Sequence, residues 1–212
     1  MELELDHFFI LTNKPKEVGD LLLSMGLPES FSRDHPGQGT SNRRFEFANG
    51  MLEILYVRDR DESVSGPARN LKFVERAENS NASPFGEILT RTDDFDSGMP
   101  FDGWTYQPDY FDPPNAFHVG SNSEIIEELL CIYVPFADPV ERIEEEGVFK
   151  SISEVKMFVP LAEMSLALHS LKPVDRLQIL QGSEHLVEVT LDRGSQGLQK
   201  DFRPELPMII NW

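Results

Sequence analysis

The sequence contains a single cysteine, Cys131, among its 212 residues, so an internal disulfide bond is excluded. The apolar neighbours Leu129, Leu130 and Ile132 predict that this thiol is buried as a small hydrophobic side chain. A lone thiol fits a reducing compartment, and we expect the protein to be cytoplasmic.

Long apolar runs and basic residues are also scarce. No stretch approaches the roughly 20 apolar residues that span a bilayer, and Met1 leads directly into Glu2-Leu3-Glu4-Leu5 instead of a basic and apolar leader. The 19 Lys and Arg are outnumbered by 37 Asp and Glu, which gives a net charge of −18. Because this charge repels phosphate backbones and anionic lipid surfaces, we expect neither nucleic-acid nor membrane partners.

Several short motifs that carry chemistry are missing. The sequence has no Gly-x-Ser-x-Gly elbow, no phosphate-binding glycine loop with Lys-Ser/Thr, no Cys-x-x-Cys pair and no His-Glu-x-x-His. The hydrolase, nucleotide-binding and zinc-finger classes therefore lose their main support.

What the sequence does contain is typical of a globular protein. Hydrophobic residues make up 40% and charged residues 26%, with 15 Phe to fill a core. The length permits one large domain or two small ones.

The spacing of apolar residues predicts mixed secondary structure. Residues 16–25 carry apolar side chains at i, i+3, i+4 and i+7 and are followed by Gly26, which predicts a helix and its end. Asn49-Gly50 is typical of a hairpin turn. The expected strands are 5–12, 44–47, 51–57, 85–92, 104–111, 116–120, 129–134, 154–159, 176–180, 185–191 and 208–212. The other expected elements are a polar connection at 58–83 with a short helix near 71–76, a segment at 93–100 too short for a full helix, and a helix at 161–171.

Two pairs of segments indicate an internal duplication. The matching pairs are 6–12 with 86–92, and 51–57 with 126–132. A repeated βαβββ module with Asp6-His7 on its first strand and Leu52-Glu53 on its fourth resembles the vicinal oxygen chelate superfamily, which includes glyoxalases, bleomycin-resistance proteins and extradiol dioxygenases. Within it, the segment 35–44 and the Asn-Gly-Met-Leu-Glu that follows are most similar to glyoxalase-like domain proteins.

This resemblance implies an α+β fold. Repeated βαβββ modules would form a curved, cup-shaped mixed sheet, and an extra βαββ-like unit would follow at the C-terminus. The expected divisions are 1–60 for the first module, 84–136 for a second module with a trimmed helix, and 150–212 for the C-terminal unit.

The resemblance also implies a metal site at the floor of the cup, with one inward residue from the first and fourth strands of each module. By position these residues are His7, Glu53, Glu87 and Glu128. An imidazole with carboxylates suits Fe²⁺, Mn²⁺, Ni²⁺ or Zn²⁺. Glu53 and Glu128 are then the candidate catalytic carboxylates for proton transfer. The set is unusually acidic, because Glu87 stands where the family has a second histidine.

Each of these residues has an ordinary structural explanation as well. His7 could hydrogen-bond to backbone at the border of the core. Strand alternation lets Glu53 face either the cleft or solvent, and we favour the cleft. For Glu87 and Glu128 we favour the structural explanation, because residues 123–130 could form a helical turn that places Glu128 in solvent.

The loop 37–44 is the expected ligand-binding element. Its glycines let backbone amides approach a ligand, and an arginine can clamp a carboxylate or phosphate. Arg43 and Arg44 point to opposite faces of a strand, and we favour Arg43 for the cleft because the family's Asn-Arg pair falls on Asn42 and Arg43. An anionic or carbonyl-bearing ligand follows. The candidate ligand-binding residues are Thr40, Asn42, Arg43, Trp104 and His118.

Two main functions fit these expectations. The first is a metal-assisted lyase, isomerase or dioxygenase-like enzyme that acts on a carbonyl or vicinal-oxygen compound. The second is a metal-free protein that binds or sequesters a small molecule on the same scaffold, and a structural or regulatory role is a third. Two modules in one chain can close the cup in a monomer, whereas the C-terminal unit could make a homodimer.

Overall fold

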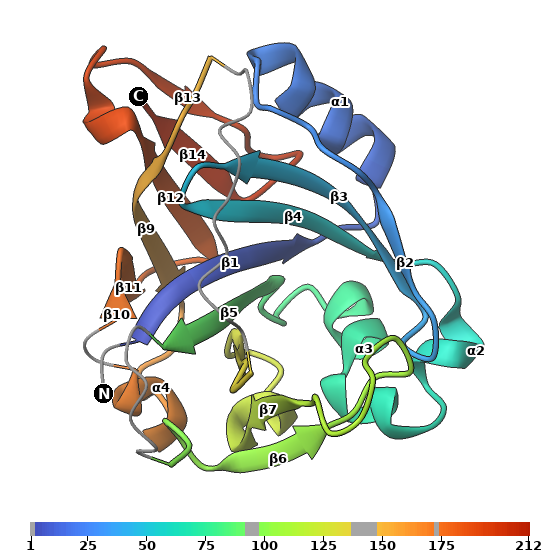
Figure 1. Cartoon of the computed structure of the whole chain (residues 1–212). Coiled ribbons are helices and arrows are strands. Elements are labelled where there is room, and N and C mark those ends of the chain that lie inside the picture. The colour runs from blue at the N-terminus through green and yellow to red at the C-terminus, as the bar shows by residue number, and fades with distance from the viewer. Residues whose placement is uncertain (1–2, 92–97, 137–147, 172–173) are drawn as a thin grey trace.

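The computed structural model describes residues 3–91, 98–136, 148–171 and 174–212. These residues form a mixed α+β fold in which one large sheet of 14 strands is accompanied by a few short helices (Figure 1). The expected α+β class is therefore confirmed. Among the described residues, no helix is long and apolar enough to cross a membrane.

The first part of the chain builds a four-stranded section with one long helix. β1 and β4 lie parallel, and β3 and β2 follow in antiparallel order. The elements are β1 (Leu3–Leu11), α1 (Pro15–Met25), β2 (Arg33–His35), β3 (Thr40–Phe47) and β4 (Gly50–Val57).

Helix α1 forms where the apolar spacing predicts it. Pro15 occupies the first turn, where its missing N–H costs nothing, and Val18 and Leu22 are buried on one face. Gly26 ends the helix in the left-handed conformation with φ of 96°, which a residue without Cβ adopts freely. The predicted helix and its end are confirmed.

The polar connection contains three short helices instead of the single one expected. They are α2 (Arg60–Ser63), η1 (Pro67–Leu71) and α3 (Phe73–Glu78). Ala68, Leu71 and Phe73 are buried in an apolar cluster with residues of β1 and β8. The connection therefore also contributes to the core between the two halves that it joins.

The next part repeats the pairing order of the first. β5 and β8 lie parallel, and β7 and β6 follow in antiparallel order. Its elements are β5 (Phe85–Arg91), β6 (Gly103–Tyr106), β7 (Phe117–Gly120), η2 (Ser121–Glu124) and β8 (Leu130–Tyr133). The expected strand 104–111 is shorter, because it ends at Tyr106. Residue 92 of the expected strand 85–92 and residues 93–97 of the expected short segment 93–100 lie outside the described residues.

The C-terminal part adds strands to the same sheet. β9 pairs with β11 and β12, and β14 joins the far side of β12. The elements are β9 (Ile152–Val159), α4 (Leu166–Ser170), β10 (Val174–Asp175), β11 (Leu177–Gln181), β12 (Leu186–Leu191), η3 (Asp192–Gly194), β13 (Gln199–Asp201) and β14 (Met208–Asn211). Helix α4 is shorter than expected, because Ser165 caps its start by accepting a hydrogen bond from Leu168 N.

Strand β1 joins all three parts. One edge pairs first with β10 and then with β4, and the other edge pairs with β5. The pairing with β5 shifts between Leu5 and His7, so Asp6 forms a β-bulge. The bulge reverses the alternation, and Leu5 and Phe8 therefore face the same side of the sheet while His7 and Phe9 face the other.

The two faces of the sheet bury different clusters. The larger cluster, here called the main core, contains Phe8, Leu22 and Phe45 and continues into the C-terminal part with Met157. The smaller cluster, here called the second core, contains Phe9 and residues of the connection and of β5 to β8. Side chains of β1, β3 and β4 that do not enter the main core thus point toward the second half of the chain.

Asn49 fastens the hairpin turn of the first part to the C-terminal part. Its Nδ2 donates to Ile152 O and its Oδ1 accepts from Ile152 N, both at 2.8 Å. Arg176 adds hydrogen bonds to the carbonyl oxygens of Asn49 and Leu5. One amide side chain therefore pairs with the start of β9 as a neighbouring strand would.

Replacing Asn49 by Ala is expected to lower the free energy of unfolding by about 1–3 kcal/mol, because two buried backbone groups of Ile152 lose their partners. Chemical denaturation measures the loss. Asn81→Ala is the control: Asn81 is exposed, so a change within about 0.5 kcal/mol is expected. Equal stability of the Asn49 variant and wild type would show that the turn is not fastened in this way.

Candidate ligand site in the central hollow

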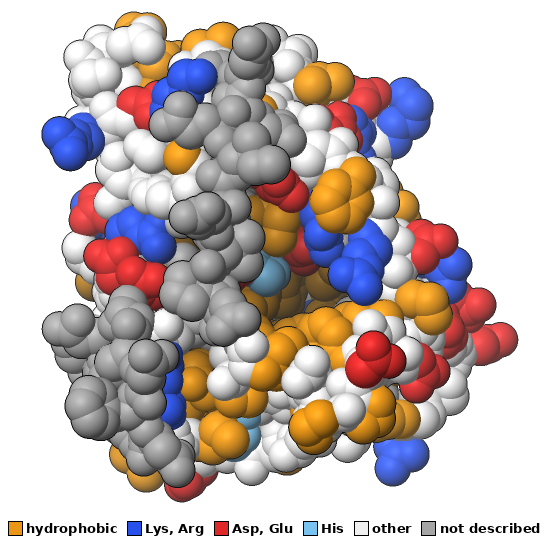
Figure 2. All heavy atoms as spheres, in the orientation of Figure 1, with side chains coloured by type: hydrophobic (Ala, Val, Ile, Leu, Met, Phe, Trp, Pro, Cys, Tyr) orange, Lys and Arg blue, Asp and Glu red, His pale blue; other side chains and the backbone are white. Residues whose placement is uncertain are grey.

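Figure 2 shows a hollow in the face of the molecule that Figure 1 presents in the same orientation, between β1 and β4 on one side and β6 and β7 on the other. Figure 2 shows basic, acidic and histidine side chains along one border of this central hollow and hydrophobic side chains along the opposite border. A recess with one polar and one apolar side is typical of a small-molecule site.

Strand alternation places the polar side chains. Arg44 on β3 lies directly opposite Glu53 on β4, so both side chains leave the same face of the sheet. Thr40 and Asn42 precede Arg44 at intervals of two and share that face. His35 at the end of β2 and Gln38 in the turn that follows complete the polar cluster: His35, Gln38, Thr40, Asn42, Arg44 and Glu53.

Hydrogen bonds link most of this cluster. Asn42 Nδ2 donates to Glu53 Oε1 at 2.7 Å, and Asn42 Oδ1 accepts from the backbone N–H of Arg33 at 2.9 Å. Thr40 Oγ1 accepts from Gln38 Nε2 at 2.8 Å. Because Asn42 and Thr40 are fully buried, they hold their neighbours in place and do not reach a ligand themselves.

His35 is a neutral member of the cluster. Burial lowers its pKa to about 4, although the nearby Glu53 carboxylate acts in the opposite direction. The amide Nδ2 of Asn42 lies 3.5 Å from His35 Nε2, so Nε2 is the acceptor nitrogen. The proton then sits on Nδ1, which donates to Thr40 Oγ1 at 2.9 Å.

Arg44 differs from the rest of the cluster. Its side chain is only 13% exposed, and its Nε lies 3.1 Å from Glu53 Oε1. Yet this Nε makes no hydrogen bond, and the described residues provide no hydrogen-bond acceptor for its other nitrogens either. The ring of Phe31 covers the guanidinium, with 4.8 Å between Cζ and the ring centroid. Of the three nitrogens, only Nε is a buried atom without a partner, so the two Nη atoms are open to solvent and available to a ligand.

A row of aromatic side chains borders the polar cluster. Tyr110 connects the two, because its ring lies 5.5 Å from the His35 ring and 4.9 Å from the Arg33 guanidinium. From Tyr110 the ring contacts continue through Phe111 to Phe117 at 5.0 and 4.8 Å. This aromatic wall consists of Tyr106, Tyr110, Phe111, Phe117 and Phe136.

Gln38 ties the two sides of the hollow together. Its Oε1 accepts hydrogen bonds from Tyr106 Oη and from Tyr110 Oη, both at 3.2 Å. Burial raises the pKa of both tyrosines. They therefore remain protonated donors, and one amide of the first half holds two rings of the second.

The expectation that Arg43 faces the cleft is wrong. Arg43 shares a face with Phe45, which packs in the main core beneath α1. Its guanidinium forms ion pairs with Glu29 at 2.6 Å and with Asp20 of α1 at 2.9 Å. Arg44 takes the position beside Glu53 instead.

Glu87 lies on the opposite face of the sheet from Glu53. It is paired with Phe8 on one side and with Cys131 on the other, and both partners belong to the main core. Ile88 is the β5 residue that pairs with His7 and faces the hollow. The expected placement of Glu87 beside His7 is wrong, because a sequence match cannot reveal the bulge that sets this register.

Glu128 precedes β8 and holds helix α4. Its carboxylate accepts from Ser165 N at 2.6 Å, from Ser165 Oγ at 2.7 Å and from Asn122 Nδ2 at 3.0 Å. All three bonds are structural, and the residue is buried. The Glu128 side chain therefore faces neither solvent nor the hollow.

The remaining candidates are divided between the two faces. His7 shares the hollow's face of the sheet with Phe9 but bonds to its neighbour Asp6. Trp104 packs on the second core, and its indole N–H donates to Ser123 Oγ at 3.1 Å. His118 faces the other way, where it stacks on Phe101 and bonds to the carbonyl oxygen of that residue at 2.8 Å.

The four residues expected to hold a metal do not fit one ion. His7 and Glu53 lie on one face, whereas Glu87 and Glu128 lie on the other. The Glu53 carboxylate already contacts the cation of Arg44. Within the described ranges, no group of three or more His, Cys, Asp or Glu lies close enough together to bind a metal.

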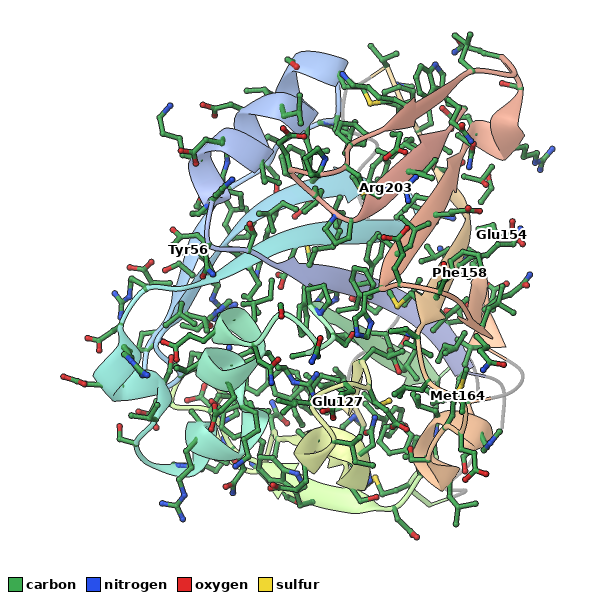
Figure 3. The ribbon with its side chains drawn as sticks, turned by 180° about the vertical axis from the view of Figure 1, so that it is seen from behind. Tyr56, Glu127, Glu154, Phe158, Met164 and Arg203 are labelled. Carbon is green, nitrogen blue, oxygen red and sulfur yellow. The ribbon has the colours of Figure 1, made fainter. Side chains whose placement is uncertain are left out.

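A second cavity, of about 720 Å³, lies on the rear side, where all three parts of the chain meet. Its lining includes Glu127, which Figure 3 labels, and Arg76. Arg76 differs from Arg44 because its Nη1 has hydrogen-bond acceptors: it donates to Ile126 O at 3.0 Å and to Glu128 O at 2.6 Å. Through these two hydrogen bonds, Arg76 holds the loop before β8 in place.

Three contributors to the site, His35, Gln38 and Arg44, were not among the predicted site residues. His35 ends β2 and Gln38 lies in the turn that follows, and no local pattern distinguishes them as buried partners of Thr40. Arg44 could have been identified, because Phe45 and Phe47 are the apolar residues of β3 and therefore place Arg43 on the core side.

No protein-family model matches the chain, and no curated protein is significantly similar to it. Among solved structures, the crystal structure of a hypothetical protein from Staphylococcus aureus has a TM-score of 0.57 and 13% identity, covering 99% of this chain and 98% of that chain. At this identity the likeness concerns the fold alone. The two proteins share an overall fold along nearly their whole lengths.

Glu87 predicts a dependence of stability on pH. Both its carboxyl oxygens are buried without a hydrogen-bond partner, and burial raises its pKa from 4.5 to about 8. The folded protein therefore holds a proton that the unfolded chain releases above 4.5. Stability should fall as pH rises from about 4.5 to 8, by up to about 1.4 kcal/mol per pH unit.

Glu87→Gln should remove this part of the pH dependence, because glutamine is neutral at every pH. Denaturation curves at pH 5, 6, 7 and 8 for the variant and wild type give the difference. Glu163→Gln, at an exposed position, is the control and should follow wild type. A Glu87 variant whose stability changes in parallel with wild type would contradict the assignment.

Proposed function

We propose that the protein binds a small anionic or carbonyl-bearing molecule in the central hollow without a metal ion. The observation that carries this proposal is the Arg44 guanidinium, which is largely buried beside Glu53 and has no hydrogen-bond acceptor among the described residues. Arginine recognises carboxylates and phosphates through its planar fork of donors. A ligand carboxylate or phosphate would supply an acceptor for the two Nη atoms of Arg44.

The aromatic wall supports an apolar body for this ligand. Small-molecule sites combine a mostly apolar lining with a few placed polar groups. Phe31 above Arg44 and Tyr110 beside Arg33 offer ring faces at the polar end of the hollow. A ligand with an anionic head and an aromatic or aliphatic body matches both sides.

We further infer that the scaffold is a pair of βαβββ-type modules that curve into a cup. Support comes from the pairing order, which is the same for β1, β4, β3, β2 and for β5, β8, β7, β6. The two parallel strand pairs also join residues that are equally far apart in the sequence. Phe9 pairs with Glu53 and Gly86 pairs with Leu130, and each pair is separated by 44 positions (53 − 9 and 130 − 86). We favour this binding function over the metal-assisted enzyme. Ile88, which pairs with His7, and Ile132, which pairs with Ile88, occupy the positions where the second module would supply metal ligands.

Metal analysis tests the absence of an ion. Protein purified without chelator should contain far less than one Fe, Mn, Ni or Zn per chain by inductively coupled plasma mass spectrometry. Glu53→Gln should leave that content unchanged. A stoichiometric metal that disappears in the variant would instead support the metal-assisted enzyme.

Adjacent arginines provide a matched pair for the ligand test. Small aromatic carboxylates at millimolar concentration should raise the melting temperature of wild type, because ligands that bind the folded state stabilise it. Arg44→Gln should abolish this increase. Arg43→Gln should lower the melting temperature of the free protein, through loss of its ion pairs with Glu29 and Asp20, but keep the increase. The reverse pattern would place the site on the α1 side.

A further inference from the structure

The pairing of Arg44 with Glu53 leaves particular atoms of both groups available. Only Arg44 Nε approaches the carboxylate, at 3.1 Å from Oε1. Oε1 also accepts from Asn42 Nδ2 at 2.7 Å. No donor among the described residues bonds to Oε2, and none of them accepts from the two Nη atoms of Arg44. The two Nη groups of Arg44 and the Oε2 atom of Glu53 therefore remain without a hydrogen-bond partner among the described residues.

The surrounding residues hold this arrangement in place. Asn42 is fully buried and fixed from both ends, by Glu53 and by the backbone N–H of Arg33. Glu53 is itself only 7% exposed, so its carboxylate has little freedom to turn. Preorganised polar groups of this kind select a ligand by the position of its donors and acceptors.

The charge of Glu53 sets a condition on the ligand. A ligand carboxylate on the Nη atoms of Arg44 lies near a second carboxylate, and like charges repel strongly in a partly buried site. A hydroxyl or amino group beside the ligand carboxylate removes the conflict, because it can donate to Glu53 Oε2. A plain carboxylate has no such donor and leaves Oε2 unpaired.

We infer that the ligand of the central hollow is a carboxylic acid that carries a hydroxyl or amino group on the adjacent carbon, with an apolar body on the aromatic wall. Its carboxylate accepts from Arg44, and its neighbouring donor binds Glu53. This inference rests on the proposed function and adds the chemical class of the ligand.

Three probes with the same carbon skeleton test the inference: 3-phenyllactate, phenylalanine and 3-phenylpropionate. Titration of the full chain, followed by calorimetry or NMR, should give a dissociation constant at least about tenfold lower for one of the first two than for 3-phenylpropionate. A charge-assisted hydrogen bond accounts for a difference of that size. This comparison needs only the wild-type protein.

Two variants then identify the groups responsible. Glu53→Gln keeps an oxygen for Asn42 but replaces the other oxygen by an NH₂ group. The preference should therefore disappear, so that 3-phenyllactate, phenylalanine and 3-phenylpropionate bind with about equal dissociation constants. Arg44→Gln should weaken all binding by about tenfold or more, whereas Arg43→Gln should leave the affinities unchanged. Circular dichroism verifies that each variant is folded.

The outcomes separate the two proposals. Equal affinities for all three probes in wild type, or a preference that persists in Glu53→Gln, would overturn the inference while Arg44-dependent binding still supported the proposed function. Binding that does not respond to Arg44→Gln, or no binding of any probe, would count against both.

Discussion

The hydrogen bonding of β1 on both of its edges is the constraint on which the rest of the structure depends. One edge is divided between β10 and β4, and the other pairs with β5, so all three parts of the chain take their register from these nine residues. The bulge at Asp6 then decides which residues enter which core. Without it, Leu3, Leu5, His7 and Phe9 would share one face, and an imidazole would enter the main core.

The division of the two faces explains why the polar cluster is stable. Buried polar groups are tolerated when they bond to one another, and His35, Thr40, Asn42 and Glu53 do so through side-chain contacts of 2.7 to 3.5 Å. Arg44 belongs to the same face but stands outside the hydrogen-bond network. The contrast with Arg76 lies in the Nη atoms: both Nη atoms of Arg76 donate to carbonyl oxygens, whereas no described residue accepts from those of Arg44.

Local patterns in the sequence predicted many of the elements but not the faces on which their side chains lie. The apolar spacing before Gly26 predicted α1, and Asn49-Gly50 predicted the hairpin, because both signals depend on neighbouring residues. The face of Glu87 depends on the pairing of β5 with β1, which involves residues some 80 positions away and a one-residue bulge. Glu128 was misplaced for a related reason, since its partner Ser165 lies in another part of the chain.

The amide of Gln38 has a consequence for the size of the hollow. It is the point where a turn of the first half grips two tyrosines of the second, through a single oxygen atom. One side chain therefore connects the two borders of the hollow. For the proposed ligand, this connection would limit bulk across the sheet more than length along it, so girth would matter more than length.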